Sequence, residues 1–276
     1  PKINFSYPLD AKKQIDDAAS FYESRLGVRP VGMWPSEQSV SKHILPFIKD
    51  AGINWIVTDE AILFKSIKRK FRDTKLVYRP HRIDLEEGIL HIVFRDRNLS
   101  DLIGFEYHQW DASAAVNDFM KHMKNIADAF KDEDVLVTIA MDGENAWEYY
   151  VNDGHDFLDL LYTRLSEAEY LKTTTVSEYL KSHESSADIK RLAAGSWIYG
   201  NFGKWIGSPY KNKAWEYLTI ARKELQTFLG SEAVPQEKKD LAVKQMQVCE
   251  GSDWFWWYGD NHDGFDCLFR EHLSNF

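Results

Sequence analysis

The stretch Val135-Leu136-Val137-Thr138-Ile139-Ala140-Met141-Asp142-Gly143-Glu144-Asn145-Ala146-Trp147-Glu148 joins an uninterrupted apolar run to a group of polar residues. The run does not alternate apolar with polar residues, which is typical of a strand covered on both faces in a parallel sheet. Proteins with such sheets carry their chemistry at the carboxyl ends of the strands. The stretch therefore predicts an α/β fold with functional side chains directly after residue 141.

The rest of the chain is expected to alternate strands and helices and then to become wholly helical. Apolar residues recur at helical spacing before Gly27 and Gly52, which are typical helix C-caps. Short β-rich runs predict strands at 31–34, 54–58, 76–79, 89–94 and 135–141, with 173–176 as a last barrel strand. Helices are expected at 9–26, 39–51, 112–130, 157–166, 213–229, 236–248 and 263–273. We therefore expect a βα-barrel portion over residues 1–185, which carries the site, and a helical subdomain over residues 186–276.

Charge and composition argue against several classes of function. The 276 residues carry a formal net charge of −9, and nucleic acids or anionic membranes would require a basic surface. We recognise no signal peptide in these residues, and no apolar run reaches the roughly 18 residues that a membrane-spanning helix needs. We expect a cytoplasmic protein with a neutral substrate and free thiols at Cys249 and Cys267. The nine histidines are scattered, so no metal or cofactor is expected.

Two groups of polar residues come directly after predicted strands. The segment Trp34-Pro35-Ser36-Glu37 places a carboxylate just before a predicted helix, where Glu37 either favours the first helical turn or takes part in catalysis. After the strand at 135–141, an Asp-Gly turn and an asparagine cap are the structural alternative to a site. Two carboxylates, an amide and an indole within six residues favour the site, which would comprise Asp142, Glu144, Asn145 and Trp147.

Aromatic and charged residues elsewhere add candidates for substrate contact. Aromatic residues make up 14% of the chain, and the segment Gly251-Ser252-Asp253-Trp254-Phe255-Trp256-Trp257-Tyr258 fits neither a helical nor a strand period. It either plugs the core or offers rings to a substrate. Arg95, Arg97 and Asp101 follow the strand at 89–94, where they either contact substrate hydroxyls or form an ion pair.

Carboxylates that come from two different strand ends can together hydrolyse a glycosidic bond. One carboxylate attacks the anomeric carbon, while the other stays protonated and donates its proton to the leaving oxygen. Nearby rings would stack on sugar faces, and Asp or Asn side chains would hold sugar hydroxyls. We therefore expect a carbohydrate substrate.

Three segments resemble the third, fourth and fifth conserved regions of glycoside hydrolase family 57, in the same order. They are Trp34-Pro35-Ser36-Glu37, Met141-Asp142-Gly143-Glu144-Asn145 and Ser252-Asp253-Trp254; Gly195-Ser196-Trp197-Ile198 also resembles the amylopullulanase-like branch of this family. The resemblance implies a retaining α-glucan-active enzyme on an incomplete, distorted (β/α)7 barrel with a helical subdomain. It implies Glu37 as the nucleophile and Asp142 as the general acid/base, without a metal. The expected substrate-binding residues are Trp34, Arg97, Asp101, Glu144, Asn145, Trp147, Asp253 and Trp254.

The chain also departs from the family pattern, which leaves other functions open. The first conserved region, a His-Gln-Pro motif, and the second region are absent from these residues. We therefore expect the C-terminal portion of a longer enzyme or one piece of a split one, with an N-terminal fragment as a possible partner that completes the barrel. The alternatives are a glucan transferase or branching enzyme of the family, a non-catalytic carbohydrate-binding protein and a metal-dependent deacetylase.

Overall fold

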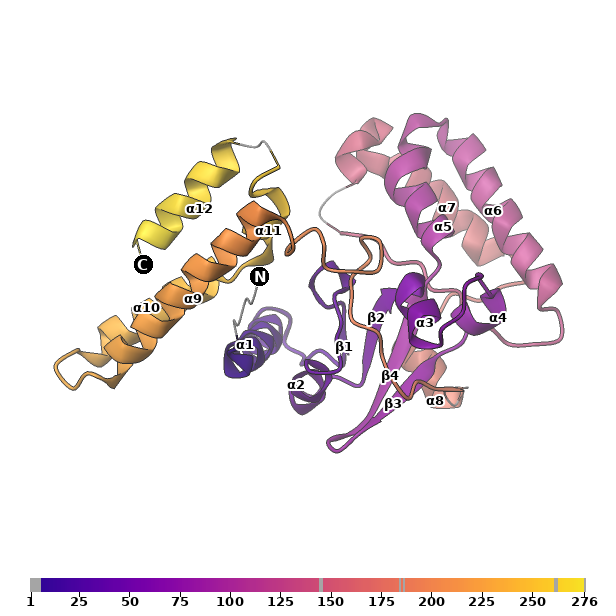
Figure 1. Cartoon of the computed structure of the whole chain (residues 1–276). Helices are drawn as coiled ribbons and strands as arrows, with labels where there is room; N and C mark the ends of the chain where they lie inside the picture. The colour runs from indigo at the N-terminus through magenta and orange to yellow at the C-terminus, as the bar shows by residue number, and fades with distance from the viewer. Residues whose placement is uncertain (1–5, 144–145, 184, 186, 261–262, 276) are drawn as a thin grey trace. The chain divides into compact units, whose positions relative to one another are not determined.

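The chain divides into two compact units in the computed structural model, which describes residues 6–143, 146–183, 185, 187–260 and 263–275. One unit runs from Pro30 to Gly200 and contains the sheet (Figure 1). The other combines the N-terminal segment up to Arg29 with everything from Asn201 onward. This division differs from the predicted one, because the first helix groups with the C-terminal helices and the sheet-containing unit extends beyond residue 185.

A five-stranded sheet is the centre of the first unit, as far as the described residues show. Its spatial order is β1-β2-β4-β3-β5, and the strands are β1 (Gly32–Met33), β2 (Trp55–Asp59), β3 (His81–Leu85), β4 (Gly88–Arg95) and β5 (Ala187–Asp188). β1, β2 and β4 are parallel to one another, whereas β3 forms an antiparallel pair with β4. The buried residues of β2 and β4 support the prediction of a sheet covered on both faces. The α/β fold class is thus confirmed.

The segment 135–141 lies where the sequence predicts a parallel strand, but it forms only a single bridge. Thr138 pairs with Arg95 in parallel orientation, and the Asp96 amide donates to the Thr138 carbonyl at 2.8 Å. β3 pairs with β4 only as far as Ile92. Residues 93–95 at the end of β4 are therefore left to pair with the segment 135–141 on that side. The segment 135–141 therefore lies beside the end of β4, as the next parallel neighbour after β1, β2 and β4.

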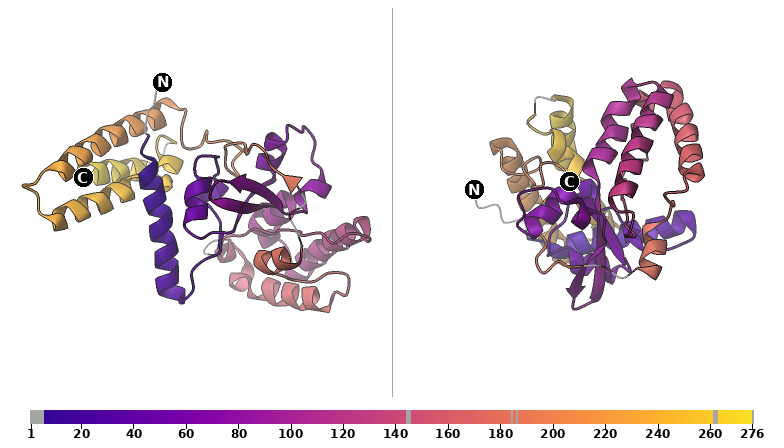
Figure 2. Two further views of the ribbon diagram at one scale, coloured as in Figure 1. Left: turned by 90° about the horizontal axis from the view of Figure 1, so that it is seen from below. Right: turned by 90° about the vertical axis from the view of Figure 1, so that its right-hand side faces the viewer.

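Helices connect and flank these strands. They are α2 (Leu45–Asp50), α3 (Glu60–Ser66), α4 (Thr74–Val77), α5 (Arg97–Asp101), α6 (Ala112–Ala129), α7 (His155–Glu167) and α8 (Val176–Ser182), with a π-helical turn at Leu102–Glu106. α6 and α7 lie side by side (Figures 1 and 2) and bury Val116, Phe119, Phe157 and Leu161 in one apolar cluster. The predicted helix at 112–130 is therefore confirmed, and its apolar face packs as its period requires.

Two predicted strands are wrong, and the predicted helix at 39–51 is too long. Leu76 and Val77 are the last residues of α4, and residues 78–79 follow it. α4 begins after Asp73, whose side chain accepts a hydrogen bond from the Lys75 amide. Residues 173–176 lead into α8, where Thr175 and Glu178 form a capping box. A strand was also not expected after residue 186, yet β5 pairs with β3.

The second unit consists of helices, as predicted for the C-terminal part. They are α1 (Pro8–Leu26), α9 (Pro209–Gly230), α10 (Gln236–Cys249), α11 (Ser252–Trp257) and α12 (Asp263–Asn275). α1 belongs to this unit because Arg222 binds Asp10 at 2.6 Å and Gln14 donates to Glu250 at 2.7 Å. The two described cysteines form no disulfide. None of the helices in the described part of the chain is long and apolar enough to cross a membrane.

Candidate active site

The carboxyl ends of neighbouring parallel segments meet at one edge of the sheet. β1 leads into Glu37, β2 ends at Asp59, β4 ends at Arg95, and the segment 135–141 leads into Asp142. The register aligns these ends, because Asp59 pairs with Arg95 and Arg95 in turn with Thr138. Such an edge is where open and closed α/β sheets bind their ligands.

Glu37 lies in a short turn with an unusual backbone. Its φ angle is 55° and that of Gln38 is 51°, values in the left-handed region that cost a non-glycine residue on the order of 1–2 kcal/mol. The turn is stabilised by its neighbours, since the Thr58 hydroxyl donates to the Gln38 carbonyl at 2.8 Å. The capping alternative for Glu37 does not fit this geometry, because the next α-helix begins only at Leu45.

The carboxylate of Glu37 is bound by a tryptophan from a distant loop. The indole Nε1–H of Trp197 donates to Oε2 of Glu37 at 2.6 Å, and the backbone amide of Trp197 donates to the Glu37 carbonyl at 3.2 Å. Glu37 is half-buried, so this donor acts where water screens it only in part. The two contacts hold both ends of the Glu37 residue.

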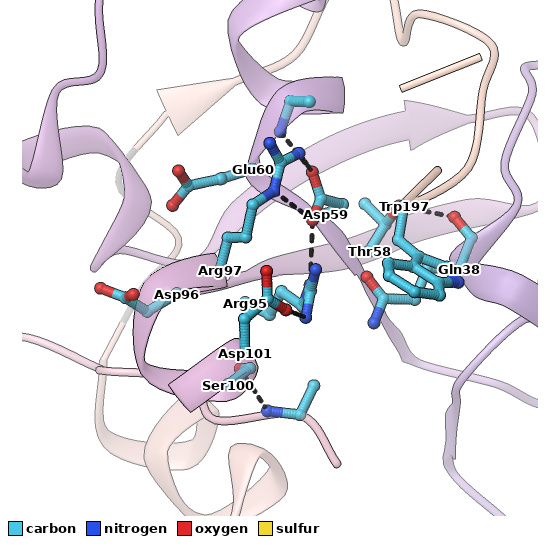
Figure 3. A network of polar contacts seen from close by, with 12 residues as sticks. Gln38, Thr58, Asp59, Glu60, Arg95, Asp96, Arg97, Ser100, Asp101 and Trp197 are labelled. Atoms are coloured by element: carbon cyan, nitrogen blue, oxygen red, sulfur yellow. Dashed lines mark hydrogen bonds and ion pairs between the residues drawn. The ribbon is translucent and has the colours of Figure 1, made fainter. Parts of the chain in front are cut away.

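A buried network of charges fills the neighbouring strand ends (Figure 3). Asp59 is fully buried and accepts from Arg95 Nε at 2.9 Å and from Arg97 Nε at 3.2 Å. It also caps α3 by accepting from the Ala61 amide, the role that its position before a helix favours. Arg95 binds Asp101 at 2.8 Å. Burial alone would lower the pKa of Arg97, but the hydrogen bond and charge of Asp59 raise it above its ordinary value.

These contacts bear on two of the predicted substrate-binding residues. Arg97 and Asp101 both take part in ion pairs within the protein. Such an ion pair is the alternative to contact with substrate hydroxyls that the sequence left open for them. The network fixes the end of β4 and with it Arg95, whose guanidinium lies over the ring of Trp197 at 5.4 Å from its centroid. Asp59 and Arg95 thereby support the residue that binds Glu37.

Asp142 is exposed at the end of the extended segment. The Ala140 amide donates to Ser100 Oγ at 3.1 Å, and Met141 packs near Gly104, where an added Cβ would lie 3.6 Å from its Cε. These contacts tie the segment to α5 and to the π-helical turn. The predicted neighbours Glu144 and Asn145 lie outside the described residues.

The remaining predicted residues lie in different surroundings. Trp34 is 38% exposed and follows β1 directly. Trp147 is instead part of the packing between α6 and α7, with its ring 5.5 Å from that of Tyr150. Asp253 and Trp254 form part of α11 in the helical unit, where Asp253 is exposed and the Trp254 indole donates to the Val248 carbonyl.

Trp197 is the residue that reasoning from strand ends did not place at the site. Its segment, Gly195-Ser196-Trp197-Ile198, belongs to the family resemblance, but no local pattern shows which carboxylate an indole 160 positions away will bind. Among the residues that the structure describes, no three His, Cys, Asp or Glu side chains are grouped as they would be to hold a metal ion.

The fold and the site define an α/β protein that gathers carboxylates and an arginine at the carboxyl edge of its parallel strands. Residues 5–190 match the model of glycosyl hydrolase family 57. The chain therefore belongs to this family. No curated protein sequence matches it.

Solved structures share its fold at low sequence identity. The α-amylase AmyC from Thermotoga maritima matches with a TM-score of 0.74 and 16% identity, over 98% of this chain and 62% of that one. The GH57-type branching enzyme from Pyrococcus horikoshii matches with a TM-score of 0.72 and 17% identity, over 99% and 60%. The 4-α-glucanotransferase from Thermococcus litoralis gives 0.69 and 16%, over 97% and 45%. The chain thus spans 45–62% of the length of these structures.

Proposed function

We propose that the protein acts on α-glucans as a retaining glycosidase, with Glu37 as the nucleophile and Asp142 as the general acid/base. Membership of glycosyl hydrolase family 57 supports the reaction class, and the names of the similar structures support an α-glucan substrate. The observation that carries the assignment of Glu37 is its hydrogen-bonded carboxylate on a strained turn at the carboxyl edge of the sheet. Strain of this kind is typical of functional positions.

The proposed reaction has two steps. In the first, a carboxylate oxygen of Glu37 forms a bond to the anomeric carbon, and the glycosidic C–O bond breaks as its oxygen takes a proton from Asp142. In the second, a water molecule gives a proton to Asp142 and attacks the anomeric carbon, and the bonding electrons return to Glu37. The exposed ring of Trp34 would stack on a sugar face.

Transfer to a second glucan is the alternative outcome of the same chemistry. A sugar hydroxyl would replace water in the second step, and the branching enzyme and the glucanotransferase among the similar structures favour this possibility. The two outcomes are separated by products: hydrolysis of starch or pullulan releases reducing ends, whereas transfer changes chain length or branching with little release.

Chemical rescue tests the two catalytic roles separately. Glu37→Ala and Asp142→Ala are each expected to lower turnover of p-nitrophenyl α-maltopentaoside by about 10²-fold or more. Azide should restore turnover in both, yielding the inverted glycosyl azide with Glu37→Ala and the retained one with Asp142→Ala.

A matched control and a clear contrary result complete this test. Asp84→Asn, which changes an exposed carboxylate on β3, should leave turnover unchanged. Full activity of Glu37→Ala would refute the proposal. Binding of the glucan without turnover by the unaltered protein would favour the carbohydrate-binding alternative instead.

A further inference from the structure

Trp197 packs against two side chains that limit how its ring can turn. Phe105 stacks on it with the ring planes 13° apart and their centroids separated by 6.2 Å. The guanidinium of Arg95, which is only 4% exposed, lies over the same indole. A planar side chain packed in this way has little rotational freedom, so its Nε1–H points in a defined direction.

The loop that carries Trp197 is also tied to the Glu37 turn through the backbone. Val40 and Gly195 exchange two hydrogen bonds, of 2.8 and 3.1 Å. The position of Gly195 admits no side chain, because an added Cβ would lie 2.3 Å from the Gly200 carbonyl oxygen. The distance between the indole and the Glu37 carboxylate is therefore set by several independent contacts.

We propose that Trp197 is a positioning residue that speeds the breakdown of a covalent glycosyl-Glu37 intermediate. This inference rests on the proposed function and concerns the second step of that reaction. Oε2 of Glu37 is the oxygen held by the indole, so Oε1 would form the bond to the anomeric carbon, and Oε2 would become the carbonyl oxygen of the ester.

The charge on Glu37 explains why the two steps respond differently to this hydrogen bond. A donor binds a carboxylate about twice as strongly as it binds a neutral acceptor. The carboxylate is charged before the first step, loses its charge as the ester forms, and regains it as the ester breaks. The Trp197 N–H therefore stabilises the transition state of breakdown relative to the intermediate, and it does not favour formation of the intermediate.

Steady-state and pre-steady-state kinetics of Trp197→Phe test this role, because phenylalanine keeps an aromatic ring but has no N–H. With p-nitrophenyl α-maltopentaoside, kcat is expected to fall about ten- to one-hundredfold. KM should fall with it, so that kcat/KM changes by only about a few fold. A burst of p-nitrophenol and a covalent glycosyl adduct on Glu37, detected by mass spectrometry, should become larger than in the unaltered protein.

Trp55→Phe is the matched control. It also removes an indole hydrogen bond in the same unit, from Trp55 Nε1 to Ser177 Oγ at 2.8 Å, but at the start of β2 rather than at its carboxyl end. This variant should show no extra accumulation of intermediate. Thermal unfolding of both variants shows whether either fails to fold.

The hydrogen bond itself is observable without turnover. In ¹⁵N-tryptophan-labelled protein, the Nε1–H proton resonance that Trp197→Phe removes should move upfield in Glu37→Gln. No movement would overturn the proposal, even if the folded Trp197→Phe variant cannot be assayed. Equal losses in kcat and kcat/KM for Trp197→Phe, without accumulation, would also overturn it while leaving the proposed function intact. Full activity of Glu37→Ala would overturn both.

Discussion

Replacing Asp59 with asparagine removes one negative charge from the most deeply buried ion network of the sheet. Asp59 is fully buried, and the side chain of Arg95 is 5% exposed. Asparagine keeps an oxygen that can cap α3 at Ala61, so the backbone contact survives. What is lost is the charge opposite Arg95 and Arg97.

The expected cost follows from the burial of this pair. Breaking a buried ion pair by removing one partner costs about 3–5 kcal/mol, because the remaining charge is left without compensation. Because Arg95 keeps its contact with Asp101, we expect Asp59→Asn to lower the free energy of unfolding by about 3 kcal/mol, the lower end of that range. For a chain of this size that corresponds to a decrease in Tm of roughly 6–12 °C.

Urea unfolding and thermal unfolding measure this loss. The control is Asp188→Asn, which removes one partner of the half-exposed pair with Arg82 and should cost about 0–1 kcal/mol. A double-mutant cycle with Arg95→Met assigns the loss to the pair. If Asp59→Asn were no more destabilising than Asp188→Asn, or if the cycle were additive, the reasoning from burial would be refuted.

Two further predictions concern close packing and a half-buried carboxyl group. Gly195→Ala should destabilise the protein by about 1–3 kcal/mol, because the new Cβ would lie 2.3 Å from the Gly200 carbonyl oxygen. The control Gly230→Ala, whose Cβ would meet nothing within 4 Å, should not destabilise it. Equal unfolding curves for the two variants would contradict the predicted clash at Gly195. Burial, followed by the charge of Asp10, raises the pKa of Glu250 to about 7. The protonated Glu250 therefore contributes to the free energy of unfolding in full below about pH 4.5, and this contribution is lost as the pH rises through about 7. Glu250→Gln should therefore be more stable than the unaltered protein by about 1–2 kcal/mol at pH 8, allowing for solvent screening, and the advantage should shrink towards pH 5; an advantage independent of pH would show that the charge is not the cause.

Local patterns predicted much of the secondary structure because they depend on residues close in sequence. The helix at 9–26 ends as expected at Gly27, whose φ of 75° suits glycine. The strands at 54–58 and 89–94 were found from their apolar, β-branched runs. The strands predicted at 76–79 and 173–176 are wrong because N-caps at Asp73 and Thr175 start helices there. A cap outweighs the weak strand propensity of so short a segment.

The sequence by itself determined that this is an α/β protein with polar side chains at the carboxyl ends of its parallel strands, and it singled out Glu37 and Asp142. The α/β class and the polar strand ends follow from hydrophobic period and chain direction, which are local. The choice of Glu37 and Asp142 rests on the resemblance of their segments to the conserved regions of glycoside hydrolase family 57. The tertiary structure alone decided that Asp59 and Arg95 pair in the interior and that Trp197 binds Glu37. A hydrogen bond between residues 160 positions apart depends on the path of the whole loop and on what packs against it, and no local pattern contains that information.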